Sequence, residues 1–165
     1  MIRPERPSDR DAIFSVNARA FPSDAEARLV DVLRERGAAA VSLVAEVDGA
    51  VVGHILFSPV TAGDRRFVAL APMAVVPEQQ RTGIGSALVC AGIKACRERG
   101  DEAIFVLGHA EYYPRFGFVP AGPQGLHYVS EDFDPHFFVL ELQAGALDGV
   151  HGLVEFHPTF DSVST

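Results

Sequence analysis

The residues best placed to do chemistry in this sequence form a short polar turn, Gln80 to Ser86 (QRTGIGS), at the start of a segment typical of a helix. Gly83 and Gly85 carry no side chain that would keep a ligand from the backbone, and the first amides of a helix have no partner within it. Such amides can bind a diphosphate at the positive end of the helix dipole, and Arg81 adds a cation. The same glycines are also typical of a sharp turn that packs closely against a sheet. Taken alone, they leave both interpretations open.

Two common nucleotide-binding loops do not fit this turn. A P-loop needs a Lys and a Ser or Thr directly after its last glycine, whereas Ile84 and Ser86 flank Gly85 and the next lysine is Lys94. The dinucleotide fingerprint needs Gly or Ala at the position of Leu88, and it belongs to the first strand of its domain. Both nucleotide classes are therefore disfavoured.

The composition predicts one ordinary globular domain, which we place at residues 1–156 with a polar C-terminal tail at 157–165. Of 165 residues, 48% are hydrophobic and 22% are charged, and no repeat or linker divides the chain. The formal net charge of −8, with no block of Lys or Arg, argues against nucleic acid as a partner. Neither a monomer nor a homodimer is favoured.

Targeting and metal signals are weak throughout. The N-terminus is charged, and no apolar run approaches the roughly 20 residues of a membrane span, so we expect a cytoplasmic protein with no membrane partner. Cys90 and Cys96 lie six positions apart on different faces of one predicted helix, which favours neither a disulfide nor a metal site. The histidines likewise lack ligand spacing, so no metal cofactor is expected.

The hydrophobic pattern predicts a mixed α/β sheet that begins antiparallel and becomes parallel around the glycine turn. Ser8 and Ser23 begin two helices, the second with a capping box to Glu26. Asp48-Gly49 is typical of a hairpin turn, and Pro72 should interrupt a buried strand with a bulge or a local splay. The expected helices are 8–21, 23–37, 83–100 and 111–118, and the expected strands are 41–47, 50–60, 67–77, 103–108, 136–142 and 152–156.

Three segments in order resemble one known superfamily. Gln80-Arg81-Thr82-Gly83-Ile84-Gly85 is similar to the acyl-CoA signature of the GNAT N-acetyltransferases, which has Gln or Arg, two residues, Gly, one residue, then Gly or Ala. The preceding MAVVPEQ resembles the strand and loop that come before that signature, and YYPRFGF resembles the late tyrosine helix with its Gly-Phe strand. Together with FFVLEL, these pieces look most like the bacterial YhbS-like branch of the superfamily.

This resemblance implies the GNAT fold: a mostly antiparallel central sheet, parallel at strands 4 and 5, with helices on both faces. It implies acetyl-CoA as the acyl donor, with direct transfer to a primary amine of a small molecule or protein residue and no covalent acyl-enzyme. A non-catalytic acyl-CoA sensor is the alternative. The implied cofactor-binding residues are Met73, Ala74, Val75, Gln80, Arg81, Thr82, Gly83, Ile84, Gly85, Ser86 and Tyr113.

The resemblance also implies a general acid but leaves the general base open. Tyr113 stands at the position of the usual acid, where a protonated phenol can donate to the leaving thiolate, and Tyr112 is expected to form a wall of the pocket. Members of the superfamily often carry a Glu or His on the fourth strand, but FVALAPMAV offers no titratable side chain. The base is therefore either a water chain or one of His54, Glu46, His109, Glu111 and Glu141.

The connection from Pro120 to Phe138 is long, aromatic and acidic, and connections of this length are often functional. If it shapes the acceptor pocket, its charged and aromatic residues favour an amine with more than one positive charge. Those residues are Tyr128, Glu131, Asp132 and Asp134.

Overall fold

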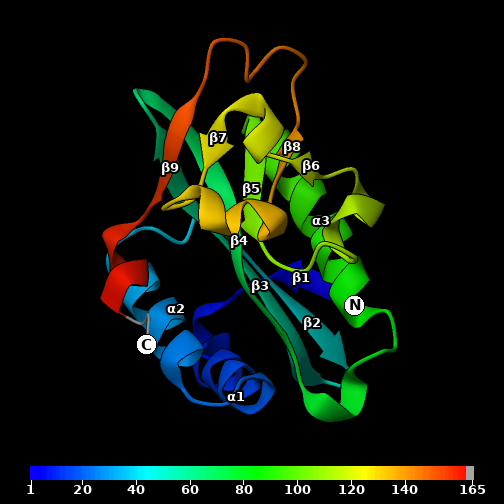
Figure 1. Cartoon of the computed structure of the whole chain (residues 1–165). Helices are drawn as coiled ribbons and strands as arrows, with labels where there is room; N and C mark the ends of the chain where they lie inside the picture. The colour runs from blue at the N-terminus through cyan, green and yellow to red at the C-terminus, as the bar shows by residue number, and fades with distance from the viewer. Residues whose placement is uncertain (163–165) are drawn as a thin grey trace.

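The structure is a computed structural model that describes residues 1–162. In this part of the chain, nine strands form a sheet in the order β1-β2-β3-β4-β5-β8-β6, with β9 paired to β3 and β7 paired to β9 (Figure 1). The strands are β1 (Ile2–Pro4), β2 (Val41–Val47), β3 (Ala50–Ala62), β4 (Arg65–Val75), β5 (Ala103–Leu107), β6 (Val119–Pro120), β7 (Leu126–His127), β8 (Phe137–Glu141) and β9 (Gly152–Phe156).

Three α-helices and six short 3₁₀ helices complete the described fold. The α-helices are α1 (Arg10–Ala20), α2 (Ala25–Glu35) and α3 (Ile84–Arg99). The 3₁₀ helices are η1 (Pro7–Asp9), η2 (Pro77–Gln79), η3 (Tyr113–Phe116), η4 (Gly122–Gln124), η5 (Glu131–His136) and η6 (Pro158–Ser162).

The strand directions confirm the predicted mixed sheet. β1 to β4 pair antiparallel in sequence, β4 and β5 pair parallel across α3, and β5 then pairs antiparallel with β8. The β2–β3 hairpin turns at Asp48 and Gly49, whose φ angles are 52° and 80°. Both angles are positive, as the predicted two-residue turn requires.

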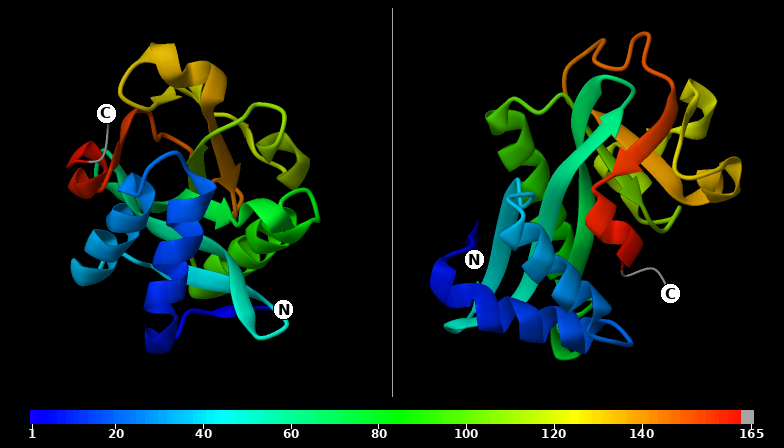
Figure 2. Two further views of the ribbon diagram at one scale, coloured as in Figure 1. Left: turned by 90° about the horizontal axis from the view of Figure 1, so that it is seen from below. Right: turned by 90° about the vertical axis from the view of Figure 1, so that its left-hand side faces the viewer.

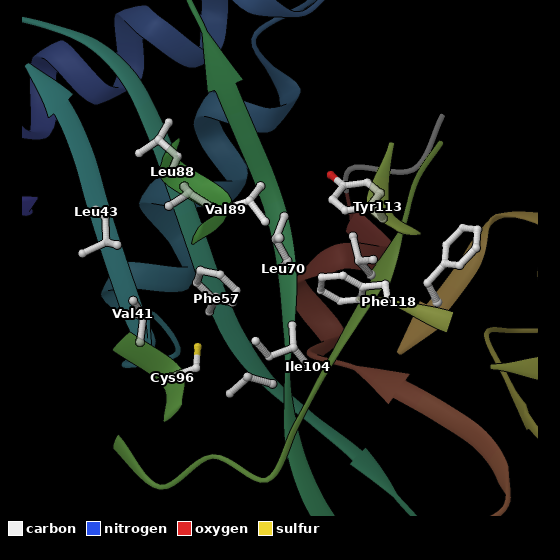
Figure 3. Close-up of a cluster of buried hydrophobic side chains, with 14 of the residues drawn as sticks. Val41, Leu43, Phe57, Leu70, Leu88, Val89, Cys96, Ile104, Tyr113 and Phe118 are labelled. Carbon is white, nitrogen blue, oxygen red and sulfur yellow. The ribbon is translucent and has the colours of Figure 1, made fainter. Parts of the chain in front are cut away.

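Helices cover both faces of the sheet, as the predicted fold class requires (Figures 1 and 2). On one face, Leu88 and Val89 of α3 pack with Phe57 and Leu70 in the cluster drawn in Figure 3. On the other face, buried side chains of α1 and α2 pack against Val44 of β2 and Leu56 of β3. The sheet is therefore the middle layer of the molecule, and any channel between its strands connects the two helical layers.

β4 parts from β5 near Pro72, which confirms the predicted interruption of this strand; both expected forms, a bulge and a splay, occur. Residue pairs between the two strands end at Ala69↔Phe105. Against β3, the register shifts between Phe57↔Leu70 and Ile55↔Met73, so that two residues of β4, Ala71 and Pro72, oppose one residue of β3. The last residues of β4 therefore have no strand partner on the side of β5.

The N-terminus of α2 differs from the predicted capping box. The Ser23 hydroxyl accepts a hydrogen bond from the Ala25 amide at 3.2 Å, and no side chain caps the helix at Asp24. Glu26 does not return a bond to the cap, because its side chain turns toward a cavity in the sheet. The Ser-x-x-Glu spacing therefore located the helix but misassigned the glutamate.

The two ends of the described chain hold more structure than the sequence predicts. Ile2–Pro4 forms β1 beside β2, although three residues are too few to show a strand alternation. The described part of the predicted tail forms η6, where Thr159 is buried and accepts a hydrogen bond from Arg36, and Phe160 packs against the α1–α2 core. The last three residues of that tail, 163–165, lie outside the described residues.

Candidate functional site

A cavity of about 860 Å³ opens where β4 and β5 part. One wall is the glycine turn and the start of α3, and another is the segment from Leu107 to Tyr113 that follows β5. Phe21, Glu26 and Leu29 line it from the α1–α2 layer. Because α2 and α3 lie on opposite faces, this cavity passes through the sheet at the splay.

The glycine turn presents the N-terminus of α3 to this cavity. Gly83 is the N-cap residue with φ 91°, and its carbonyl accepts the first helical bond, from the Ala87 amide at 3.0 Å. The amides from Ile84 to Ser86 therefore have no partner in the helix. No side chain of the described residues caps this end of α3. These free donors and the helix dipole can bind an anion.

Two polar side chains of the turn hold its shape. The Gln80 amide Nε2 donates to the Val75 carbonyl at 3.0 Å, and the Thr82 hydroxyl donates to the Gln79 carbonyl. These bonds link the turn to the segment before it, at the end of β4 and at η2. Gln80 and Thr82 therefore fix the position of the free amides.

Most of the predicted cofactor-binding residues meet at this cavity. The residues that line it are Met73, Val75, Gln80, Arg81, Gly83, Gly85, Ser86 and Tyr113. Ala74 is buried with Val16 of α1, because neighbouring side chains of a strand point to opposite faces. Ile84 packs into the core cluster of α3, and Thr82 is exposed. These three residues do not line the cavity.

Arg115 also lines the cavity, although no sequence pattern predicted it. It lines the cavity together with Arg81, and its guanidinium lies 4.4 Å from the centre of the Tyr112 ring. Such a contact between a cation and an aromatic face holds the arginine in place. The α3 end of the cavity therefore carries two guanidinium groups beside the free amides.

The two neighbouring tyrosines have different surroundings. Tyr113 is buried, and its ring fits so closely over Gly108 that a Cβ at Gly108 would lie 2.3 Å from it. Burial raises the pKa of the Tyr113 phenol to about 12, which keeps it protonated at neutral pH. Tyr112 lines the cavity as predicted, with its hydroxyl 3.3 Å from the Ser86 hydroxyl.

The structure rules out His54 as a base for this cavity, because the side chain is fully buried on the α1 side of β3. Ser42 donates to Glu5 at 2.7 Å and so accepts from His54 Nε2 at 2.9 Å, which leaves Nδ1 to accept from the Asn17 amide at 3.2 Å. Burial lowers the pKa of His54 to about 4. The ring is neutral, and both of its nitrogens are occupied.

The other candidate bases separate into two groups. Glu46 bonds to Arg3, Glu141 accepts from the amides of Gly145 and Leu147, and neither lines the cavity. Glu111 is exposed outside the cavity lining. His109 does line it. Of the five predicted side chains, only His109 is in a position to meet a ligand there.

Glu26 is a second titratable residue of the cavity. It was not predicted, because its spacing from Ser23 indicated a helix capping box. Among the described residues that line the cavity, it is the only one with a carboxylate. Its oxygen Oε2 is shielded from solvent and receives no hydrogen bond from the described protein groups. The packing of α2 against the sheet, which no local pattern shows, brings this side chain to the splay.

The long connection does not contribute its predicted residues to the cavity. Asp134 bonds to His127 at 2.8 Å, and the Tyr128 ring packs against Phe137 and Phe156. Tyr128, Glu131, Asp132 and Asp134 are all absent from the cavity lining, which contradicts their expected role in selecting the acceptor. The connection instead covers the end of the sheet through Ala121 and Leu126.

Comparison with known proteins identifies the family. Residues 10–118 match the Acetyltransferase (GNAT) family. The chain belongs to this family. It is 40% identical over 164 residues to the uncharacterized N-acetyltransferase YhbS of Escherichia coli K12, covering 98% of both chains. It is also 46% identical over 125 residues to the uncharacterized N-acetyltransferase YjhQ of the same organism, covering 72% of this chain and 69% of YjhQ.

Solved structures of relatives agree with the fold. The E. coli YhbS structure in complex with CoA superposes with a TM-score of 0.94 at 39% identity, covering 98% of this chain and 91% of YhbS. A Brucella melitensis GNAT family acetyltransferase in complex with acetyl-CoA gives a TM-score of 0.82 at 35% identity, covering 98% and 97% of the two chains. The fold class and the YhbS-like relationship are thereby confirmed.

Two features are absent from residues 1–162. None of their helices has both the length and the apolar character needed to cross a bilayer. No group of three or more His, Cys, Asp or Glu side chains in that range is arranged to hold a metal ion.

Proposed function

We propose that this protein transfers the acetyl group of acetyl-CoA directly to a primary amine. The observation that carries the proposal is the combination of an uncapped helix N-terminus, two arginines and a buried tyrosine in one cavity at the β4–β5 splay. Relatives of this fold at 35% and 39% identity were solved with acetyl-CoA and with CoA.

The proposed donor fits the α3 end of the cavity. CoA carries a pyrophosphate, which the amides from Ile84 to Ser86 and the guanidinium of Arg81 can bind. Its pantetheine arm carries amide groups, and the unpaired edge of β4 at Met73 to Val75 offers them backbone partners. The phosphates then lie at α3, and the arm runs along β4 into the sheet.

The chemical step needs orientation and one proton donor at the sulfur. An acceptor that binds as an ammonium first loses a proton to water, and the neutral nitrogen then bonds to the thioester carbonyl carbon. The carbon–sulfur bond breaks, Tyr113 gives its proton to the departing thiolate, the nitrogen gives up a second proton to water, and the phenol regains its proton from solvent. Tyr113 lines the cavity and keeps its proton at neutral pH, since burial raises the pKa of the phenol to about 12, so a proton is available when the thiolate forms. Both cysteines lie outside the cavity lining, which favours direct transfer over a cysteine acyl-enzyme.

The missing base on β4 motivates a second function, a sensor that binds acyl-CoA without turnover. A panel of amines, polyamines, amino acids and peptides, incubated with the protein and acetyl-CoA, separates the two functions by thiol release. The enzyme predicts amine-dependent release above the rate of hydrolysis. Saturable acetyl-CoA binding with no amine-dependent release would favour the sensor, and absence of acetyl-CoA binding would contradict both.

A further inference from the structure

The geometry points to Glu26 as the residue that binds the ammonium group of the acceptor, a primary amine on an apolar body. This inference rests on the proposed acetyl transfer and extends it to the other end of the cavity. Glu26 lies in the first turn of α2, on the face of the sheet opposite α3. An acceptor held there reaches the thioester from the side of the splay that the donor does not occupy.

The charges along the cavity divide by end. The described residues that line it place both arginines, Arg81 and Arg115, in the glycine turn and in η3. The one carboxylate, Glu26, comes from the α1–α2 layer. A cavity with cations at one end and an anion at the other suits an anionic donor and a cationic acceptor, because each ligand meets opposite charge.

The surroundings of Glu26 indicate a ligand rather than a structural bond. Its Oε2 is shielded from solvent and receives no hydrogen bond from the described protein groups. A buried oxygen of this kind costs free energy unless something donates to it, and most such groups in proteins are paired. An ammonium group supplies three donors together with the opposite charge. Because Oε2 itself is closed to solvent, the ammonium group would meet the carboxylate from the cavity, which the partly exposed Glu26 side chain lines.

The residues beside Glu26 define the rest of the acceptor. Phe21 and Leu29 line the same end of the cavity, and Leu29 is only 4% exposed. Apolar walls around a single carboxylate favour an alkyl or aryl group that carries one amine. Amino acids are disfavoured as acceptors, because the carboxylate of an amino acid would be repelled by the carboxylate of Glu26 at close range.

A comparison of amines with their alcohols tests this directly. NMR-detected titration measures binding of 2-phenylethylamine and hexylamine, and of the matching alcohols, with and without CoA. The proteins are the wild type, Glu26→Gln and Glu35→Gln. Glu35 is an exposed carboxylate on the same helix that does not line this cavity, so its substitution is the matched control.

We expect the wild type and Glu35→Gln to bind at least one of the amines roughly 10- to 100-fold more tightly than its alcohol, the range for a hydrogen bond between charged groups. Glu26→Gln keeps the side-chain size and should lose this preference. A wild type without any preference, or a Glu26→Gln variant that retains it, overturns the inference. CoA binding is scored separately: its absence would contradict the proposed function, and the comparison of amine with alcohol would still judge Glu26.

Discussion

The polar chain behind β3 and the cavity between β4 and β5 use similar groups in opposite ways. Behind β3, His54 bonds to Asn17 and Ser42, and Ser42 bonds to Glu5, which Arg34 holds through two hydrogen bonds. In the cavity, the first amides of α3 and the Oε2 atom of Glu26 have no protein partner among the described residues. The Asn17 Oδ1 atom is also buried without a partner among the described residues, so the two regions differ mainly in access: only the free groups of the second region lie at a cavity that a ligand can enter.

This contrast explains why the buried histidine is a poor base and why a glycine turn is a good binding site. Each nitrogen of His54 already has a partner, so the ring gains nothing from a ligand proton. The α3 amides gain charge-assisted hydrogen bonds only when an anion arrives. Four substitutions test the contrast, starting with the largest expected effect.

Gly85→Val should weaken acetyl-CoA binding by roughly 1,000-fold, the loss of about two hydrogen bonds to charged groups. Gly85 has no positive φ, and a Cβ there would lie 3.3 Å from the Tyr112 hydroxyl, so the Tyr112 side chain must shift to admit the valine. Calorimetry measures the affinity, and Cys90→Val, at an exposed site on the same helix, is the control. Near-normal affinity in a folded Gly85→Val protein would show that the first amides of α3 do not bind acetyl-CoA.

Tyr113→Phe should lower kcat roughly 100-fold, the lower range for loss of a general acid, with the KM for acetyl-CoA nearly unchanged. The ring packing over Gly108 is kept, because only the hydroxyl is removed. Steady-state rates of thiol release give both constants. Tyr112→Phe is the control, and its loss should appear mainly in KM, since that hydroxyl contacts Ser86.

A high-pH fall in kcat offers a second check on Tyr113. Because burial raises its pKa to about 12, no loss of activity below pH 10 should depend on this residue. If Tyr113→Phe removed a limb of the wild-type profile near pH 8, the phenol would titrate there and the raised pKa would be wrong.

His54→Gln should change the pH dependence of stability and leave acetyl-CoA binding intact. The folded pKa of about 4 lies below the ordinary value of 6.5, so the unfolded chain binds more protons between these values, and stability falls as pH falls through this window. The expected loss from pH 8 to pH 5 is about 2 kcal/mol in the wild type. Urea unfolding at both pH values should show this component missing from the variant. If the free energy of unfolding had the same pH dependence in both proteins, the pKa of His54 would not be lowered by folding.

Asp134→Asn should have the smallest effect, with acceptor rates within about twofold of the wild type, as for a substitution distant from the site. Asp134 bonds to His127 and does not line the cavity. Thiol release with mono-amines and polyamines measures the ranking of acceptors. A changed order of preference among these amines would indicate that the connection from Pro120 to Phe138 does contribute to acceptor selection.

Local patterns predicted those features of the site that depend on neighbouring residues. The glycine turn, the break at Pro72 and the Tyr113 segment each follow from residues close in sequence, and they meet because one strand–helix–strand unit joins them. Glu26 was misread because its nearest sequence partner, Ser23, suggested a cap. Only the packing of α2 on the far face brings it to the splay.

For His54, the strand face was predictable from the sequence, but the element that packs against that face was not. Its place on the face of Leu56 was readable from the alternation of the strand, yet the sequence did not show that this face packs against α1. Arg115 was similarly hidden inside a segment valued for its tyrosines. In each case, the sequence did not show which part of the fold would pack against the residue.

A single-turnover experiment tests the central claim most directly. Protein in excess over acetyl-CoA labelled in its acetyl group is mixed with an amine, and the label is then located by mass spectrometry. Direct transfer predicts one labelled N-acetyl amine for each thiol released, with no label on the protein. Label retained on the protein, or recovered as acetate while the amine stays unmodified, would contradict direct transfer.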